Sequence, residues 1–185
     1  MPFIQTISHS EAEGQLKDIY DDIVNKRGKL AEVHKIQSLN PDTIVHHMDL
    51  YMAIMYKKSP LTRAQREMIA VVVSVANKCT YCRHHHAEAL LFYWKDPKKL
   101  DSFIKDYNSI DLSEVDLNLC LLAKQLTEIP GSSTEKLIAH IKELGLEDRA
   151  ILDATLVIAY FNFVNRIVLG LGVAIEADQG QGYKF

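Results

Sequence analysis

The stretch Glu67-Met-Ile-Ala-Val-Val-Val-Ser-Val-Ala-Asn-Lys-Cys-Thr-Tyr-Cys-Arg-His-His-His-Ala-Glu-Ala-Leu90 joins an apolar run to a polar segment rich in reactive side chains. From Met68 to Ala76 nearly every residue is apolar, so the acid that precedes the run should lie against the core. If the chain is helical from about Thr80, then Cys79, Cys82 and His86 lie at i, i+3 and i+7 and share one face. Two thiols and an imidazole on one stripe indicate a reactive or metal-binding site.

Composition sets the broad class. A chain of 185 residues with 48% hydrophobic and 24% charged residues is typical of one globular domain, here taken as 1–185. The net charge of −3 does not favour nucleic acid or an anionic membrane as a partner. No signal peptide is visible, and no uninterrupted apolar stretch approaches the ~18 residues of a membrane span. Three cysteines do not form a secreted disulfide framework, so we expect a cytoplasmic protein.

Periodicity and caps predict an all-α fold. We expect N-terminal helices within 8–58, a core at about 61–92, C-terminal helices within 97–172 and a tail at 173–185. Within the tail, the segment from Asp178 should be loose or should pack on a partner subunit. Ser10-Glu-Ala-Glu13 has the pattern of a capping box, and Thr62-Arg-Ala-Gln65 should cap the helix that carries Glu67. In that helix Val71 to Val73 favour a strand by propensity, but 14 residues without a turn signal favour a buried helix.

An internal duplication of a helical unit is a weaker prediction. A shift of 85 residues aligns Leu61 with Leu146, Val72 with Val157 and Asn77 with Asn162, so a buried helix leads to a polar residue in both halves. The cysteines have no counterpart in the second half.

The surroundings of the two cysteines favour thiol chemistry. A free cysteine has a pKa of ~8.5 and is mostly unreactive at neutral pH. A helix N-terminus would favour the thiolates of Cys79 and Cys82, and His86 could take or return a proton. In a single straight helix Glu67 would lie ~18 Å from Cys79, so it joins the site only if the chain folds back at Asn77-Lys78. The i, i+3 spacing of the cysteines also permits a disulfide.

Glu67, Cys79-x-x-Cys82 and His86 at these spacings resemble the core signature of the alkylhydroperoxidase D-like proteins of the carboxymuconolactone decarboxylase superfamily. The resemblance is clearest over about Leu61 to Leu90. Flanking segments at Glu11-Ala-Glu-Gly14 and Tyr160-Phe-Asn-Phe-Val-Asn165 resemble the peroxidase-related branch.

This resemblance implies an all-helical thiol peroxidase that forms trimers or hexamers and needs no heme, flavin or metal. Cys82 would attack a hydroperoxide, and Cys79 would resolve the product and exchange with an external dithiol of lipoyl or thioredoxin-like type. Glu67 and His86 would relay protons. Family members carry histidine immediately before the second cysteine, whereas this chain has Tyr81. A phenol with a pKa of ~10 cannot shuttle protons at neutral pH, so Tyr81 would donate a hydrogen bond, with His85 or His84 covering part of that role.

Other interpretations of the same residues stay open. Cys79 and Cys82 could be reduced helical cysteines without a role. With His86, and Glu67 as a fourth ligand, they could instead hold zinc in a structural module. A cofactor-free decarboxylase or isomerase of the wider superfamily would not need the cysteine pair.

Polar residues outside the motif are less informative. His84 fits a solvated face, and Cys120 lies among leucines as a core residue. Four polar groups on the last helix could line the pocket, although bonds to neighbouring helices are commoner for such groups: Asp153, Tyr160, Asn162 and Asn165.

Overall fold

A computed structural model describes residues 1–176 of the protein. The helices in chain order are α1 (Gly14–Arg27), α2 (Glu32–Lys35), α3 (Pro41–Met55), α4 (Arg63–Ala76), α5 (Thr80–Trp94), α6 (Pro97–Lys105), the 3₁₀ turn η1 (Tyr107–Ser109), α7 (Glu114–Glu128), α8 (Glu135–Glu143) and α9 (Asp148–Leu171). No strand occurs within the described residues, which confirms the predicted all-α class. The predicted loose segment from Asp178 onward lies outside the described residues.

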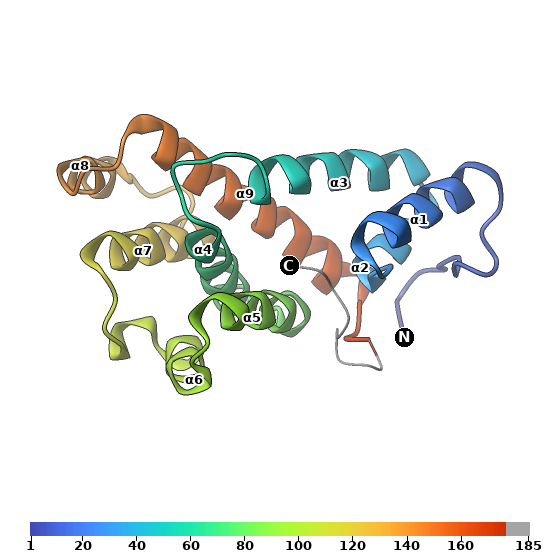
Figure 1. Ribbon diagram of the computed structural model, residues 1–185, viewed down its shortest axis with the longest axis horizontal. Helices are drawn as coiled ribbons and strands as arrows, with labels where there is room; N and C mark the ends of the chain where they lie inside the picture. The colour runs from blue at the N-terminus through green and yellow to red at the C-terminus, as the bar shows by residue number, and fades with distance from the viewer. Residues whose placement is uncertain (177–185) are drawn as a thin grey trace.

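Helices α4 and α9 form the centre of the molecule. Helix α4 packs against α5, α7 and α9, and α9 also contacts α3 (Figure 1). Figure 1 shows α1 to α3 toward one end of the long axis and α6 to α8 toward the other. The main core lies between α4, α5, α7 and α9, and a smaller cluster joins α1 to α3. The predicted site around Cys79 and Cys82 therefore lies where α1 to α3 meet the other helices.

The apolar run of α4 is a helix because it is buried on every side. All residues from Arg66 to Ser74 are buried. Since α4 is covered by three neighbouring helices, burial of its valines outweighs their preference for strands. Thr62 caps the helix as predicted: its Oγ1 accepts from Gln65 N at 3.2 Å, and Gln65 Oε1 accepts from Thr62 N at 2.9 Å.

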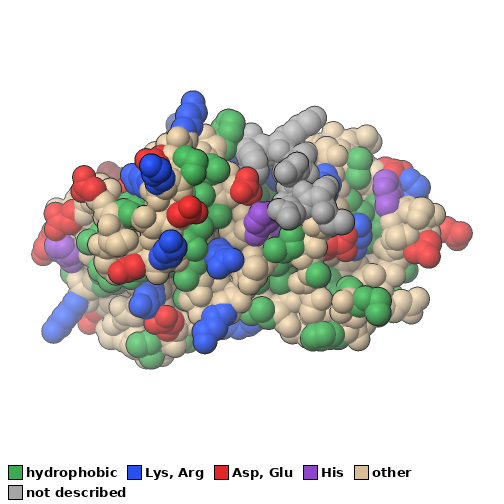
Figure 2. All heavy atoms as spheres, turned by 90° about the horizontal axis from the view of Figure 1, so that it is seen from below, with side chains coloured by type: hydrophobic (Ala, Val, Ile, Leu, Met, Phe, Trp, Pro, Cys, Tyr) green, Lys and Arg blue, Asp and Glu red, His purple; other side chains and the backbone are tan. Residues whose placement is uncertain are grey.

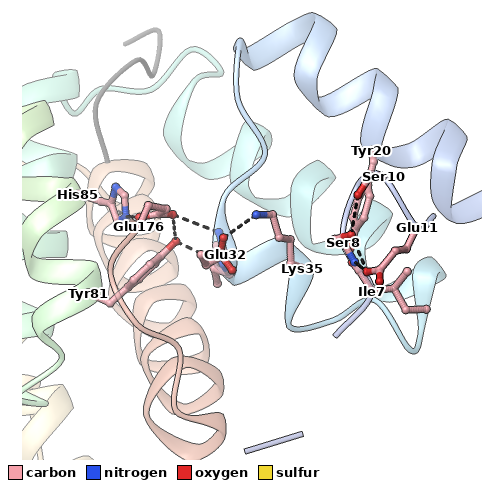
Figure 3. Close-up of polar contacts among 11 residues, drawn as sticks. Ile7, Ser8, Ser10, Glu11, Tyr20, Glu32, Lys35, Tyr81, His85 and Glu176 are labelled. Atoms are coloured by element: carbon pink, nitrogen blue, oxygen red, sulfur yellow. Dashed lines mark hydrogen bonds and ion pairs between the residues drawn. The ribbon is translucent and has the colours of Figure 1, made fainter. Parts of the chain in front are cut away.

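One predicted helix start is wrong. Helix α1 begins at Gly14, after Glu13, and Ser10 does not cap it. Glu11 Oε2 instead accepts hydrogen bonds from Ser8 N at 3.1 Å and Ser8 Oγ at 2.6 Å (Figure 3). The side chain of Glu11 therefore closes a turn over residues 8–11, before the helix begins.

Helix α9 is long and apolar enough to cross a membrane, with a mean hydropathy of 1.6 over an 18-residue window. Core helices meet the same test, and 44% of this window is buried inside the protein. Its contacts with α3, α4, α7 and α8 account for the apolar residues that are buried.

The surface of the protein carries charges of both signs. On the face shown in Figure 2, acidic and basic side chains are interspersed with apolar ones. This agrees with the small net charge of −3.

Candidate active site

The chain does fold back between Glu67 and the cysteines. Lys78 adopts a left-handed backbone conformation with φ 57°. Its N–H donates to Val75 O at 2.9 Å, and the N–H of Cys79 donates to Ser74 O at 2.8 Å. These two bonds form a Schellman motif, with lysine where glycine is the usual residue. The chain thereby turns away from the axis of α4, and Cys79 is the N-cap of α5.

The fold-back brings Glu67 to His86. Glu67 Oε2 lies 2.6 Å from His86 Nδ1, and Glu67 Oε1 accepts from Arg63 at 2.6 and 2.7 Å. Burial alone would raise the pKa of the fully buried Glu67, but His86 and Arg63 outweigh it and hold the pKa below its usual value. An ionised Glu67 fixes a hydrogen on Nδ1, which leaves Nε2 as the basic nitrogen of neutral His86.

The two site cysteines are free, buried thiols with different acidities. Hydrogen bonding from Cys82 lowers the pKa of Cys79 despite its burial, with help from the backbone N–H groups of Cys82 and Tyr81. The same bond to Cys79 raises the pKa of Cys82 well above its usual value, and burial adds to this. In the reduced protein, Cys79 at the helix N-terminus is therefore the more acidic of the two thiols.

A cavity of about 100 Å³ opens beside Cys82. Cys82, His85 and His86 of α5 form one wall, while Cys79 is not among the lining residues. The other walls come from α1, α2, α3 and α9 and include Arg27, His34, His47, Tyr51, Tyr160 and Phe161. A substrate in the cavity would thus meet Cys82 rather than Cys79.

Tyr81 and His85 are tied to the segment after α9. Glu176 Oε1 accepts from Tyr81 OH at 2.8 Å, and Glu176 Oε2 lies 2.9 Å from His85 Nε2 (Figure 3). The same carboxylate accepts from Glu32 N at 3.1 Å. Burial would raise the pKa of Glu176, but hydrogen bonds and the charge of His85 lower it well below its usual range. Tyr81 donates a hydrogen bond, as predicted, and its acceptor is Glu176.

Helix α9 supplies two contacts to the motif. Phe161 packs edge-on against the His86 ring, with centroids 4.3 Å apart. Asn165 is fully buried, and hydrogen bonding from its side chain lowers the pKa of Cys82, against the larger effects of Cys79 and burial. Asn165 was noticed in the sequence only as a polar residue on an apolar helix, and spacing alone did not link it to Cys82.

The remaining predicted candidates lie apart from the cysteines. Asp153 accepts from Ser59 at 2.6 Å and from Arg149 at 2.8 Å. Asn162 bonds Asn77 at 3.0 Å, so two residues related by the 85-residue shift touch each other, although duplication itself stays a prediction. Cys120 is fully buried in the main core.

No group of three or more His, Cys, Asp or Glu side chains in residues 1–176 has an arrangement that could hold a metal ion. The candidate zinc ligand His86 is instead engaged through Nδ1 by Glu67.

Fold and site together define a class: an all-helical protein with a buried Cys-x-x-Cys at a helix start and a Glu–His pair behind it. Residues 44–101 match the model of the carboxymuconolactone decarboxylase family. No curated protein matches the sequence.

Solved structures share the fold over nearly the whole chain. An uncharacterized peroxidase-related protein from Silicibacter sp. TM1040 is 24% identical with a TM-score of 0.86, and the match covers 99% of this chain and 96% of that one. An uncharacterized peroxidase-related protein with an alkylhydroperoxidase AhpD core, from Ralstonia eutropha JMP134, is 22% identical with a TM-score of 0.85, and the match covers 99% of this chain and 98% of that one. A cysteine-to-alanine variant of the debrominase Bmp8, in complex with 2,3,4-tribromopyrrole, is 19% identical with a TM-score of 0.79, and the match covers 94% of this chain and 91% of that one.

Residues 44–101 are thus similar to the carboxymuconolactone decarboxylase family, and the described chain has a fold of the alkylhydroperoxidase D-like type.

Proposed function

We propose that the protein reduces small hydroperoxides with the Cys79–Cys82 pair and is recycled by an external dithiol in a reducing compartment. The observation that carries this proposal is the position of Cys82 on the cavity wall, one turn before a histidine that a buried glutamate holds. The peroxidase-related proteins of the same fold support the reaction class.

The first step oxidises Cys82. Its proton passes to Nε2 of His86, and Cys82 Sγ then attacks the terminal peroxide oxygen. The O–O bond breaks, a sulfenic acid forms on Cys82, and the alkoxide leaves as the alcohol after it takes a proton from His86. Asn165 favours the negative charge on Cys82 that this step needs.

The second step forms the disulfide. The thiolate of Cys79 attacks Cys82 Sγ, and hydroxide leaves as water after it takes a proton. A dithiol of lipoyl or thioredoxin-like type then reduces the disulfide and is itself oxidised to a disulfide. The lowered pKa of Cys79 suits it as resolving thiolate and as leaving group in that exchange.

A thiol count and a kinetic assay test this function. One equivalent of tert-butyl hydroperoxide should remove two of the three thiols, and a dithiol should restore them, with zinc measured on the same sample. Cys82→Ser should abolish peroxide consumption, whereas Cys120→Ala should retain it because Cys120 lies in the core. Unchanged consumption by Cys82→Ser would contradict the proposal, as would unreactive thiols beside stoichiometric zinc.

Reductive dehalogenation of a small halogenated ring is the second candidate. A debrominase shares the fold, and aromatic side chains line the cavity here: Tyr51, Tyr81, Tyr160 and Phe161. The two thiols would supply two electrons, so a carbon–bromine bond would be replaced by carbon–hydrogen, with release of bromide and a proton and formation of the disulfide. Bromide release from tribromopyrrole that exceeds peroxide consumption would favour this candidate.

A further inference from the structure

Arg27 is a cation on the cavity wall. Arg27 ends α1, and its guanidinium lies 5.3 Å from the ring centre of Tyr51 and 5.0 Å from that of Tyr56. The guanidinium also donates a long hydrogen bond, of 4.0 Å, to Met52 Sδ. In residues 1–176, no Asp or Glu forms an ion pair with Arg27.

A half-buried charge of this kind is costly without a counter-charge. Arg63, which also lies over the Tyr56 ring at 3.8 Å, meets this requirement through Glu67. The tyrosine faces can hold the Arg27 guanidinium in place by cation–π attraction, but they do not neutralise it. The charge of Arg27 is therefore available to a ligand in the cavity.

The acids nearest to the motif are already engaged. Both oxygens of Glu67 are used, one by Arg63 and one by His86. Both oxygens of Glu176 are used as well, by Tyr81 and Glu32 N on one side and by His85 on the other. Neither carboxylate is placed to serve Arg27 in place of a ligand.

A second polar group in the cavity also lacks a partner. His34 is 9% exposed, and its Nδ1 is buried without a hydrogen bond. Burial lowers the pKa of His34 to about 3, so the ring is neutral at physiological pH and can bond a polar ligand atom without adding charge. Its neighbour His47 is bonded through Nδ1 to Gln37 at 2.9 Å.

The size and lining of the cavity limit the ligand. Besides Arg27, His34 and His47, the polar lining residues are Lys29, Cys82, His85 and His86. The other walls are aromatic or aliphatic and include Val33, Met48, Tyr160 and Val164. The cavity measures about 100 Å³, and a buried apolar cavity of ~150 Å³ is known to hold benzene. Since this cavity is smaller than that one but is open at one side, it suits a short chain or a single ring that is partly enclosed.

We propose that this cavity binds a small organic anion, a carboxylate with a single-ring or short-chain body, and that Arg27 anchors its negative group. The reacting group of the substrate then lies at Cys82. The identity of that reacting group rests on the proposed function, whereas the anion site rests on Arg27 and the cavity alone.

Calorimetry on the reduced, full-length protein tests the anion site with benzoate and with benzyl alcohol, its uncharged counterpart of similar size. The wild type should bind benzoate more tightly. Arg27→Gln should weaken benzoate binding roughly tenfold to a hundredfold, the range of a charge-assisted hydrogen bond, and change benzyl alcohol binding less than about twofold. Arg27→Lys should fall between, because it keeps the charge and loses the planar fork.

Lys26→Gln is the matched control. It removes the same charge one residue earlier, from an exposed side chain paired with Asp22, and should bind both ligands as the wild type does. Benzyl alcohol binding reports whether Arg27→Gln is folded. The inference is overturned if the wild type does not bind benzoate, if it binds the two ligands equally, or if Arg27→Gln leaves their ratio unchanged.

Kinetics separates this inference from the proposed function. Arg27→Gln should raise KM for the para-carboxylate of cumene hydroperoxide much more than it changes KM for cumene hydroperoxide itself. Benzoate binding that depends on Arg27, in a protein that consumes no peroxide, would support the anion site and reject the peroxidase. Peroxide turnover with the same KM for the charged substrate in both proteins would do the reverse.

Discussion

Glu67 divides its two carboxylate oxygens between Arg63 and His86. Arg63 does not line the cavity, and its side chain is 12% exposed beneath the Tyr56 ring. Its contribution is to keep Glu67 ionised and aimed at His86, because burial alone would favour the neutral acid. Arg63 is therefore a positioning residue for the proposed proton relay.

Replacing Arg63 with glutamine should make peroxide consumption more sensitive to acid. Without Arg63, only His86 opposes the effect of burial, so the pKa of Glu67 rises and the acid limb of the rate profile moves to higher pH. The rate at pH 7 should fall about tenfold, which corresponds to roughly 1.4 kcal/mol. Measuring kcat/KM from pH 5 to 9 checks both effects.

Arg149→Gln provides the control, because Arg149 binds Asp153 four residues on, as Arg63 binds Glu67, and its side chain is 62% exposed. Its pH profile should match that of the wild type. Equal shifts in both variants would mean that the change is one of stability and not of the site.

Helix α4 carries both Arg63 and Glu67, so its N-terminal cap supports the site. The Thr62–Gln65 capping box satisfies two backbone N–H groups at the start of the helix. Its last turn is closed by the Schellman motif at Lys78, which aims the following helix back along α4. The capping box and the Schellman motif define the ends of the helix on which the Glu–His pair depends.

Thr62→Ala should lower the free energy of unfolding by about 1 kcal/mol, the usual cost of a lost threonine cap. Thr134→Ala is the comparison, because Thr134 is the N-cap of α8 and makes no side-chain cap bond. That variant should unfold within about 0.5 kcal/mol of the wild type. Urea unfolding at pH 7 measures both, and equal losses would show that the cap bond of Thr62 contributes nothing.

At the scale of the whole molecule, two buried histidines link stability to pH. Burial lowers the pKa of His34 to about 3 and that of His47 to about 4, whereas both should titrate near ~6.5 in the unfolded chain. The charges of His47 and Arg27 lower the pKa of His34 further. Below pH ~6.5 the unfolded chain binds protons that the folded protein does not, so acid favours unfolding.

The free energy of unfolding should therefore fall as the pH is lowered from about 6.5 to 4.5, by roughly 1 kcal/mol per pH unit for each histidine. Urea titrations at several pH values measure the slope. His47→Gln should reduce it by about one proton, while His140→Gln, at a half-exposed position on α8, should leave it unchanged. Stability that is flat over this range would contradict the argument.

Self-association stays a prediction. Helix α9 exposes several large apolar side chains that the described residues do not cover: Leu152, Leu156, Phe163 and Leu169. They give the predicted homo-oligomer a surface on which it could form.

Short-range signals determined most of the helices and the motif. The Thr62 capping box and the apolar run of α4 depend on residues close together in the chain, so the sequence alone was enough to locate them. The spacing of Cys79, Cys82 and His86 predicted a shared helical face for the same reason. The Ser10 cap was wrong because Ser8 and Glu11 form a competing local turn, and such alternatives differ by little energy.

Only the tertiary structure decided which distant groups complete the site. Arg27 precedes Cys82 by 55 residues, Asn165 and Glu176 follow it by 83 and 94, and no periodicity links residues that far apart. The sequence made the role of Glu67 conditional on a fold-back at Asn77-Lys78, and the Schellman motif there meets that condition. Helices can be predicted because their hydrogen bonds join residues within one turn of each other. The cavity, by contrast, forms only when five elements pack together, and its charge depends on which lining side chains this packing leaves without an ionic partner.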